Sequence, residues 1–275
     1  MRINWFYKKR QESDMIVEEI VKRGSGHLIS EIHDKIAWIV FNNPDRMNAM
    51  SKDMWDSSAN LLDNYASDSK VRAIVLTGAG ERSFVAGADI SKFETERAST
   101  EAMASYNESV ANFHNSLNAI TKQTIARVNG YCIGGGLAIA IGCDIRVCSE
   151  KSTFGVPAAK LGIGYKAKGI MELERFGGPA FTAEIFYTGR QFSSEEAKVM
   201  RLVNRVVPED KLDEAVADLL GRVAQNAPLS IRAVKEALIE SGKPDSERDF
   251  SAHHSTVEQS QPSSDYTEGS TAFME

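Results

Sequence analysis

The sequence lacks several features that would place it in a specialised class of protein. Its 275 residues include only three cysteines, Cys132, Cys143 and Cys148, and neither their odd number nor their spacing suits a disulfide framework or a metal site. No apolar run approaches the roughly 20 residues that a membrane-spanning helix needs. We therefore expect a cytoplasmic protein that has no metal centre and does not enter a membrane.

An excess of positive charge is also absent. The formal net charge is -6, which gives no electrostatic footprint for nucleic acid and predicts that the chain has no nucleic-acid partner. The first ten residues carry Lys8, Lys9 and Arg10 but no apolar segment, so we do not expect them to act as a secretory signal. With 42% hydrophobic residues, the remainder can bury one large core.

The order of expected elements indicates an α/β fold. Strands are predicted at 27–32, 36–41, 73–77, 124–128 and 144–148, and helices at 51–66, 99–120 and 137–141. Beyond Pro179 the pattern is helical, at 180–188, 194–200, 208–225 and 228–241. Strands alternating with helices are typical of α/β proteins. The last stretch, 245–275, is too polar to form a core of its own.

Two glycine-containing segments, 83–90 and 128–138, each follow a predicted strand. Glycines allow a backbone to approach a ligand closely, and the free N–H groups at the start of a helix attract an anion or a developing oxyanion. The two segments could therefore form an oxyanion hole, although Gly134, Gly135 and Gly136 could equally be a tight turn for close packing of a helix on a strand. Neither segment has the pattern of a Walker A loop or of a dinucleotide-binding loop.

A longer series of motifs surrounds these segments. It comprises Asn43-Pro-Asp-Arg-Met-Asn48-Ala49, Ala86-Gly-Ala-Asp-Ile90, Val128-Asn-Gly-Tyr131, Gly134-Gly-Gly136, Cys143-Asp-Ile145, Tyr187-Thr-Gly-Arg190, Leu202-Val-Asn-Arg-Val-Val-Pro208 and Ala272-Phe273. Together and in this order they resemble the enoyl-CoA hydratase/isomerase, or crotonase, superfamily over about residues 27 to 275.

The resemblance implies a crotonase spiral of β-β-α turns at 26–195, a C-terminal helical region at 196–275 that makes a homotrimer or a hexamer of two trimers, and a polar N-terminal extension at 1–25. It also implies an acyl-CoA substrate, with coenzyme A entering as part of that substrate and no permanently bound cofactor. The backbone N–H groups of Ala88 and Gly135 would polarise the thioester carbonyl.

Further residues take roles from the same resemblance. The path of the adenine and pantetheine groups would be lined by Arg46, Met47, Asn48, Ala49, Ala86, Asp89 and Ile90. Phe273 would reach the coenzyme A of a neighbouring subunit. In most members a Lys/Arg cluster follows this phenylalanine, whereas Met274 and Glu275 follow it here.

The sequence departs from the family at the acid/base pair. A hydratase uses two carboxylates at the substrate double bond, one to activate water and one to deliver a proton. The matching positions hold Ala138 and Ala158, which can do neither. True hydratase activity is therefore not expected from the usual pair.

Two alternatives follow from this loss. The segment 161–170 resembles that of methylmalonyl-CoA decarboxylases, in which a tyrosine lies beside the departing carboxylate. Tyr165 would then be the catalytic side chain of a CoA-ester decarboxylase or hydrolase. The simpler interpretation is that Tyr165 is a loop aromatic packed at the rim of the pocket. The second alternative is an acyl-CoA-binding protein without catalysis. His114 lies about one helical turn from the position of a histidine base in some dehalogenases of the superfamily, which favours an ordinary helix histidine.

Overall fold

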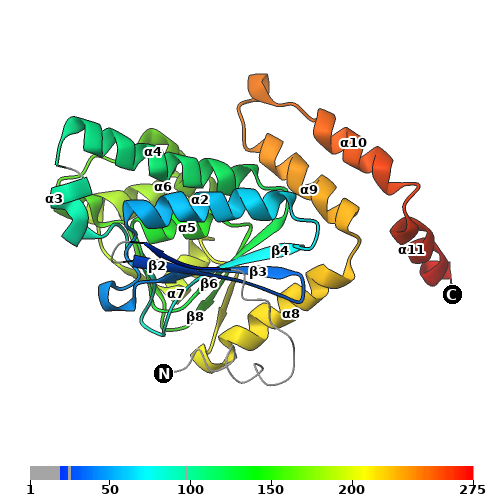
Figure 1. Ribbon diagram of the computed structural model, residues 1–275, viewed down its shortest axis with the longest axis horizontal. Helices are drawn as coiled ribbons and strands as arrows, with labels where there is room; N and C mark the ends of the chain where they lie inside the picture. The colour runs from blue at the N-terminus through cyan, green and yellow to red at the C-terminus, as the bar shows by residue number, and fades with distance from the viewer. Residues whose placement is uncertain (1–18, 24–25, 97, 275) are drawn as a thin grey trace.

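The computed structural model describes residues 19–23, 26–96 and 98–274, and two sheets lie at its centre (Figure 1). The larger sheet has the order β1-β2-β3-β4-β6-β8-β11. Its strands are β1 (Glu19–Arg23), β2 (Gly26–His33), β3 (Ile36–Asn42), β4 (Ala73–Gly78), β6 (Gln123–Val128), β8 (Ile145–Ser149) and β11 (Arg205–Val207). The pairs β1–β2 and β2–β3 are antiparallel, whereas the pairs from β3 to β11 are parallel.

A smaller sheet is built from four short strands in the order β10-β9-β7-β5. These are β5 (Ser83–Val85), β7 (Tyr131–Ile133), β9 (Thr153–Gly155) and β10 (Phe192–Ser193). Each of β4, β6 and β8 in the large sheet is followed along the chain by one of these short strands and then by a helix. The chain thus makes three successive β-β-α turns, as the resemblance implied.

The helices of these turns, together with a helix that precedes them, cover one face of the large sheet. They are α2 (Lys52–Ser67), α4 (Thr100–Ala119), α5 (Gly135–Gly142) and α6 (Ala167–Thr188), and Figure 1 shows α2 and α4 side by side above the sheet. The short helix α3 (Phe93–Glu96), which has no buried residue, lies against α4 at the end of this layer. Helix α2 begins where the Ser51 hydroxyl accepts a hydrogen bond from the backbone N–H of Met54, a normal N-cap. Helix α6 bends at Gly178 and Pro179, where the backbone leaves the helical conformation.

The large sheet is buried on both faces, and β4 shows why its sequence is continuously apolar. Ile74 and Leu76 belong to the main core under the helices, whereas Ala73 and Val75 face a second cluster with α8 (Leu212–Gln225). Successive side chains of a strand point to opposite faces, so a strand covered on both sides must be apolar throughout.

The C-terminal helices form an arm that extends from the body: α9 (Pro228–Ser241), α10 (Ser251–Ser260) and α11 (Ser264–Met274). Helix α10 packs along α9, and α11 lies at the far end (Figure 1). Large apolar side chains are exposed along this arm, namely Val234, Leu238, Val257, Tyr266, Phe273 and Met274. Helix α7 (Ser194–Val199) and the short 3-10 segments at 44–46, 90–92, 157–161, 209–211 and 245–247 complete the described chain.

Several predicted elements match, and others were missed. Predicted helix 180–188 is the second half of the longer α6, and the polar stretch 245–275 contains α10 and α11. Of the predicted extension 1–25, residues 19–23 pair with β2 as an edge strand, and residues 1–18 and 24–25 lie outside the described part of the chain.

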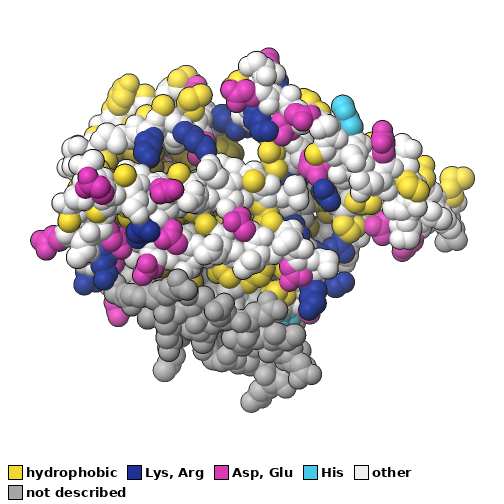
Figure 2. Space-filling view, turned by 45° about the horizontal axis from the view of Figure 1, so that its top comes forward, with side chains coloured by type: hydrophobic (Ala, Val, Ile, Leu, Met, Phe, Trp, Pro, Cys, Tyr) yellow, Lys and Arg dark blue, Asp and Glu magenta, His cyan; other side chains and the backbone are white. Residues whose placement is uncertain are grey.

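Among the described helices, none combines the length and the apolar character needed to cross a membrane. Figure 2 shows acidic and basic side chains interspersed over the face that it presents.

Candidate functional site

The two glycine segments meet at the start of α5. A Cβ atom added to Gly87 would lie 3.4 Å from the carbonyl oxygen of Ile133 and 3.9 Å from the backbone nitrogen of Gly135. A Cβ atom added to Gly135 would lie 3.8 Å from the Cα atom of Gly87. Gly87 has φ +98 and Gly134 has φ +56, conformations that residues with a side chain rarely adopt. The fold therefore brings together two backbone segments that are far apart in the sequence.

The backbone N–H of Ala88 is left free by the way its loop is held. Met50 donates its N–H to the carbonyl oxygen of Gly87 at 2.8 Å, and Asp89 donates its N–H to the carbonyl oxygen of Met50 at 2.9 Å. This β-bridge between Met50 and Ala88 uses the carbonyl group of Gly87 and the N–H group of Asp89, and it does not use the N–H group of Ala88. The Ala88 nitrogen itself donates no backbone hydrogen bond within the part of the chain that the structure describes. Ala88 as a residue is also only half-buried.

The backbone N–H of Gly135 is free for a different reason. Gly135 is the first residue of α5, and the first N–H groups of a helix have no partner within the helix. Gly135 is half-buried, and the helix dipole adds partial positive charge at this end. Ala88 and Gly135 thus offer two unpaired N–H groups from backbone segments that touch, which is what the predicted oxyanion hole requires.

Close packing fixes α5 against the small sheet. A Cβ atom on Gly136 would lie 2.0 Å from the carbonyl oxygen of Val85, closer than any real contact of this kind. The packing interpretation of the glycine triplet therefore holds for Gly136, whereas the oxyanion role of Gly135 stays a prediction. Gly136 permits the close packing of helix on strand, and Gly135 presents its N–H.

The other side of Gly135 is covered by aromatic side chains. The six-membered ring of Trp55 would lie 3.4 Å from a Cβ atom on Gly135. The Trp55 indole donates a hydrogen bond to the Tyr106 hydroxyl at 3.1 Å, and its ring centroid lies 5.2 Å from that of Phe113 and 5.9 Å from that of His114. Burial, together with the positive charge of the nearby Lys168 ammonium, lowers the pKa of His114 to about 4, so the imidazole is neutral at pH 7.

Ala138 and Ala158, which the resemblance matches to the two catalytic glutamates of the family, lie on α5 and in the segment after β9. Ala138 is in the first turn of α5, where its N–H donates to the carbonyl oxygen of Gly134 at 3.1 Å. Ala158 is buried in the 3-10 segment that follows β9. Neither side chain can hold or release a proton, so the site has no acid/base pair at these positions.

Tyr165 lies just before α6 and packs against the core. Its ring centroid is 4.9 Å from that of Phe186, and a Cβ atom on Gly169 would lie 2.8 Å from its Cε1 atom. Burial raises the pKa of Tyr165 and the negative charge of Glu172 adds to the effect, so the phenol stays protonated at neutral pH. The contacts agree with a packed aromatic and leave its predicted catalytic role open.

The residues predicted to line the coenzyme A path divide into two groups. Asn48 is 1% exposed, and its side chain accepts from the N–H of Asn43 and donates to the carbonyl oxygens of Ala79 and Ser83 at 2.9 and 2.7 Å. It therefore ties its own loop to the strand before Ala88. Asp89 and Ala49 are likewise buried, and one Asp89 oxygen accepts from the N–H and hydroxyl of Ser91.

The second group is accessible. Arg46 and Ile90 are exposed, and Met47 and Ala86 are half-buried. The N–H of Ala86 donates to the carbonyl oxygen of Met47 at 3.1 Å, which joins these residues into one loop pair beside Ala88. Only this second group can contact a bound molecule through side chains as the structure stands.

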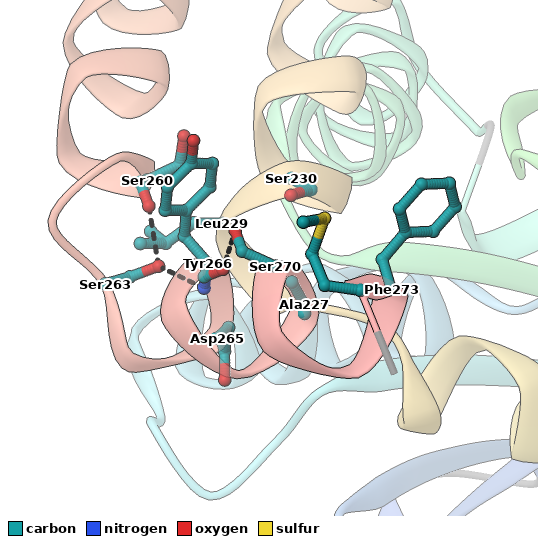
Figure 3. A pocket seen from close by; sticks show the side chains of 11 residues that line it. Ala227, Leu229, Ser230, Ser260, Ser263, Asp265, Tyr266, Ser270 and Phe273 are labelled. Carbon is teal, nitrogen blue, oxygen red and sulfur yellow. Dashed lines mark hydrogen bonds between the residues drawn. The ribbon is translucent and has the colours of Figure 1, made fainter.

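Phe273 lies apart from the other predicted residues, at the end of α11, and its side chain is 91% exposed. It borders a cavity of about 550 Å³ between α9 and α11 (Figure 3). The lining residues carry no cationic side chain; they are Ala227, Leu229, Ser230, Ser260, Ser263, Asp265, Tyr266, Gly269, Ser270, Phe273 and Met274. Figure 1 shows α11 at the far end of the arm, away from α5, so within one chain the helix that carries Phe273 lies apart from the helix that begins at Gly135.

Sequence reasoning missed Trp55 and gave His114 no role. Both residues lie near Gly135 because α2, α4 and α5 pack together, and no local sequence pattern predicts contacts between these helices. In the sequence, a tryptophan on the apolar face of a predicted helix is indistinguishable from an ordinary core residue. The only sequence feature that could have indicated a place for Trp55 and His114 near the site is that their two helices flank the glycine segment 83–90.

Comparisons with known proteins identify the family of this chain. Residues 31–275 match the family described as enoyl-CoA hydratase/isomerase. The chain is 34% identical over 212 residues to the short-chain-enoyl-CoA hydratase of Clostridium acetobutylicum, covering 77% of this chain and 80% of that protein. It is 32% identical over 251 residues to the crotonyl-CoA hydratase of Syntrophomonas wolfei, covering 90% and 95%.

A solved structure shares the whole architecture. The enoyl-CoA hydratase/carnithine racemase from Magnetospirillum magneticum aligns with a TM-score of 0.84 and 33% identity over 92% of this chain and 93% of that one. The predicted α/β fold and crotonase-type spiral are thereby confirmed. The matched length, the identity and the shared fold together show that this chain belongs to the enoyl-CoA hydratase/isomerase family of the crotonase superfamily.

Proposed function

We propose that the protein binds an acyl-CoA thioester and polarises its carbonyl group with the backbone N–H groups of Ala88 and Gly135. The observation that carries the proposal is that these two N–H groups lie on touching segments and donate no backbone hydrogen bond within the described part of the chain. When an acyl-CoA reacts at its α-carbon, negative charge develops on the thioester oxygen as an enolate forms. Two N–H donors that are already in place stabilise that charge without reorganisation.

The family name does not by itself settle the reaction. Relatives are named as a crotonyl-CoA hydratase and a carnitinyl-CoA dehydratase, which add or remove water. Water addition by the usual pair of carboxylates is not available here, because positions 138 and 158 are alanines. We therefore propose enolate chemistry on an acyl-CoA, with hydration of an enoyl-CoA weak or absent.

The main alternative is decarboxylation of a CoA ester, which needs an oxyanion hole and no carboxylate base. The bond between the α-carbon and the substrate carboxylate breaks, carbon dioxide leaves, and the electron pair remains as an enolate held by Ala88 and Gly135. A proton then returns to the α-carbon. The observation that supports this alternative is that positions 138 and 158 hold alanines, because decarboxylation needs no carboxylate there; Tyr165, as the sequence resemblance implies, would donate the proton. Hydrolysis of the thioester would use the same two N–H groups.

A panel of thioesters distinguishes these reactions. We expect hydration of crotonyl-CoA at no more than the background rate, and release of carbon dioxide from malonyl-CoA or methylmalonyl-CoA if decarboxylation is the activity. Tyr165→Phe should then abolish carbon dioxide release, whereas Tyr187→Phe, which changes an exposed tyrosine on the same helix as Phe186, should not. Rapid hydration would refute the assignment of lost acid/base chemistry.

Binding without turnover of any thioester would instead support a non-catalytic acyl-CoA-binding protein. If isothermal titration calorimetry finds no binding of any acyl-CoA, the whole proposal fails.

Assembly forms a second part of the proposal. We propose that the arm of α9, α10 and α11 joins subunits into a homotrimer or a hexamer, and that Phe273 contacts coenzyme A bound to a neighbour. The proposal is supported by exposed apolar side chains at Leu238, Tyr266 and Phe273, since a row of such residues on a soluble surface marks an interaction site. Light scattering should give three or six times the 30.2 kDa of one chain, and a monomer would refute it.

A further inference from the structure

His114 is a half-buried titratable residue that the proposed chemistry does not use. It lies on α4, with its ring centroid 5.9 Å from that of Trp55 and 5.3 Å from that of Phe113. The nearest side-chain atoms to a Cβ atom on Gly135 belong to Trp55, at 3.4 and 3.7 Å, and not to His114. The imidazole is therefore close to the oxyanion hole, one layer of side chains further out.

No described residue accepts a hydrogen bond from His114 or donates one to it. Its Nδ1 atom is completely buried and has no partner, although the side chain as a whole is only half-buried. The polar groups around it are already engaged: the Trp55 indole donates to Tyr106, and the Lys168 ammonium donates to the Asn115 side-chain oxygen at 3.2 Å. A buried polar atom without a partner is unfavourable, so its presence beside a ligand site points to a partner on the ligand.

The charge state of His114 indicates what kind of group it would meet. Since burial and Lys168 keep the imidazole neutral at pH 7, it offers one N–H donor and one nitrogen acceptor. A half-turn about the Cβ–Cγ bond exchanges the two edges of the ring, so either edge can face a ligand. A neutral donor and acceptor pair suits a hydroxyl or a carbonyl group.

We propose that the His114 imidazole hydrogen-bonds a hydroxyl or carbonyl group on the acyl chain of the substrate, beyond the carbons next to the thioester. The protein would then prefer acyl-CoA thioesters with a polar acyl chain over plain hydrocarbon chains of the same length. This inference rests on the proposed function, because it requires an acyl-CoA whose thioester lies at Ala88 and Gly135.

The test compares matched thioesters without turnover. Isothermal titration calorimetry would measure the dissociation constants of hexanoyl-CoA, of its 4-, 5- and 6-hydroxy derivatives, and of the corresponding 4- and 5-oxo compounds. One net hydrogen bond in a buried site predicts that at least one polar derivative binds about fivefold to tenfold more tightly than hexanoyl-CoA. The hydroxy and oxo series together tell whether the imidazole donates or accepts.

Variants assign the preference to the imidazole. His114→Phe keeps a ring of similar size and should abolish the preference, and His114→Gln should restore part of it. The control His254→Phe, at an exposed histidine on α10, should leave the preference unchanged. Thermal unfolding of each variant verifies that it is folded.

Three outcomes are separable. If the native protein binds all the thioesters equally, the inference is wrong while the proposed function stands. If His114→Phe keeps the preference of the native protein, the inference is likewise wrong. If none of the thioesters binds, the proposed function itself fails and the inference with it.

Discussion

Gly136→Ala is the substitution for which the structure predicts the sharpest effect on the fold around the site. The added Cβ atom would lie 2.0 Å from the carbonyl oxygen of Val85 and 2.8 Å from its carbonyl carbon, and both atoms belong to the backbone. No side-chain rotation relieves such a clash, so α5 must move away from β5. We place the cost of this overpacking at about 3 kcal/mol, the upper end for inserted methyl groups.

The higher helix propensity of alanine offsets part of this loss of stability. Alanine is a better helix former than glycine by about 1 kcal/mol, which leaves a net destabilisation of roughly 2 kcal/mol. For a chain of this size that corresponds to a fall in Tm of roughly 4 to 8 °C. Because α5 carries Gly135 at its start, the same displacement should weaken acyl-CoA binding.

Thermal unfolding followed by circular dichroism, together with acyl-CoA titration, measures both effects. The matched control is Gly221→Ala on the exposed side of α8, where an added Cβ atom meets no atom within 4 Å. That variant should gain about 0.5 to 1 kcal/mol and bind acyl-CoA normally. A Gly136→Ala protein with native stability and native affinity would refute the packing argument.

Three further predictions concern stability. The pKa of His114 is about 4 in the folded protein and 6.5 in the unfolded chain, so the unfolded state binds more protons between pH 4 and pH 6.5. The free energy of unfolding should therefore fall by up to about 3 kcal/mol as the pH drops from 6.5 to 4. A His114→Phe protein whose stability has the same pH profile as the native protein would contradict this. Lys235→Met removes the cation that pairs with Asp144 and should cost about 2 to 4 kcal/mol in urea unfolding, with Lys211→Met, at an exposed pair, costing less than 1 kcal/mol. Ser51→Ala removes the N-cap of α2 and should cost about 1 kcal/mol; no change in the urea midpoint would count against the cap.

The fold was predictable where local patterns are strong. The apolar run of β4 and the N-cap of α2 lie within one residue of their predicted positions. The strands of the small sheet were not predicted, because β5, β7 and β9 have only three residues each and gain stability from one another across the sheet. The kink at Gly178 and Pro179 likewise concealed the first half of α6.

The candidate site shows the same division. The resemblance identified Ala88 and Gly135, and the structure brings their segments into contact. The resemblance could not predict that the Asn48 side chain donates hydrogen bonds to backbone carbonyl groups, or that Trp55 covers Gly135. Both features depend on contacts between distant parts of the chain. The predicted contact of Phe273 with coenzyme A on a neighbouring subunit stays a prediction, because the structure of one chain contains no second subunit.

The central claim is that the Gly135 N–H polarises the thioester carbonyl, and one pair of variants isolates that hydrogen. Gly135 is not among the glycines with a left-handed φ, and it is the first residue of α5, a position where proline is well tolerated. Gly135→Pro therefore removes the N–H, whereas Gly135→Ala keeps it and places a Cβ atom at 3.4 Å from Trp55, a normal contact.

The infrared stretching frequency of the thioester carbonyl, measured with an acyl-CoA bound, reports the polarisation directly. We predict a clear shift to lower frequency in the native protein and in Gly135→Ala, and a much smaller shift in Gly135→Pro. Any turnover should fall about 100-fold to 1,000-fold in the proline variant alone. A folded Gly135→Pro protein that binds acyl-CoA with the full native shift would contradict the oxyanion-hole assignment.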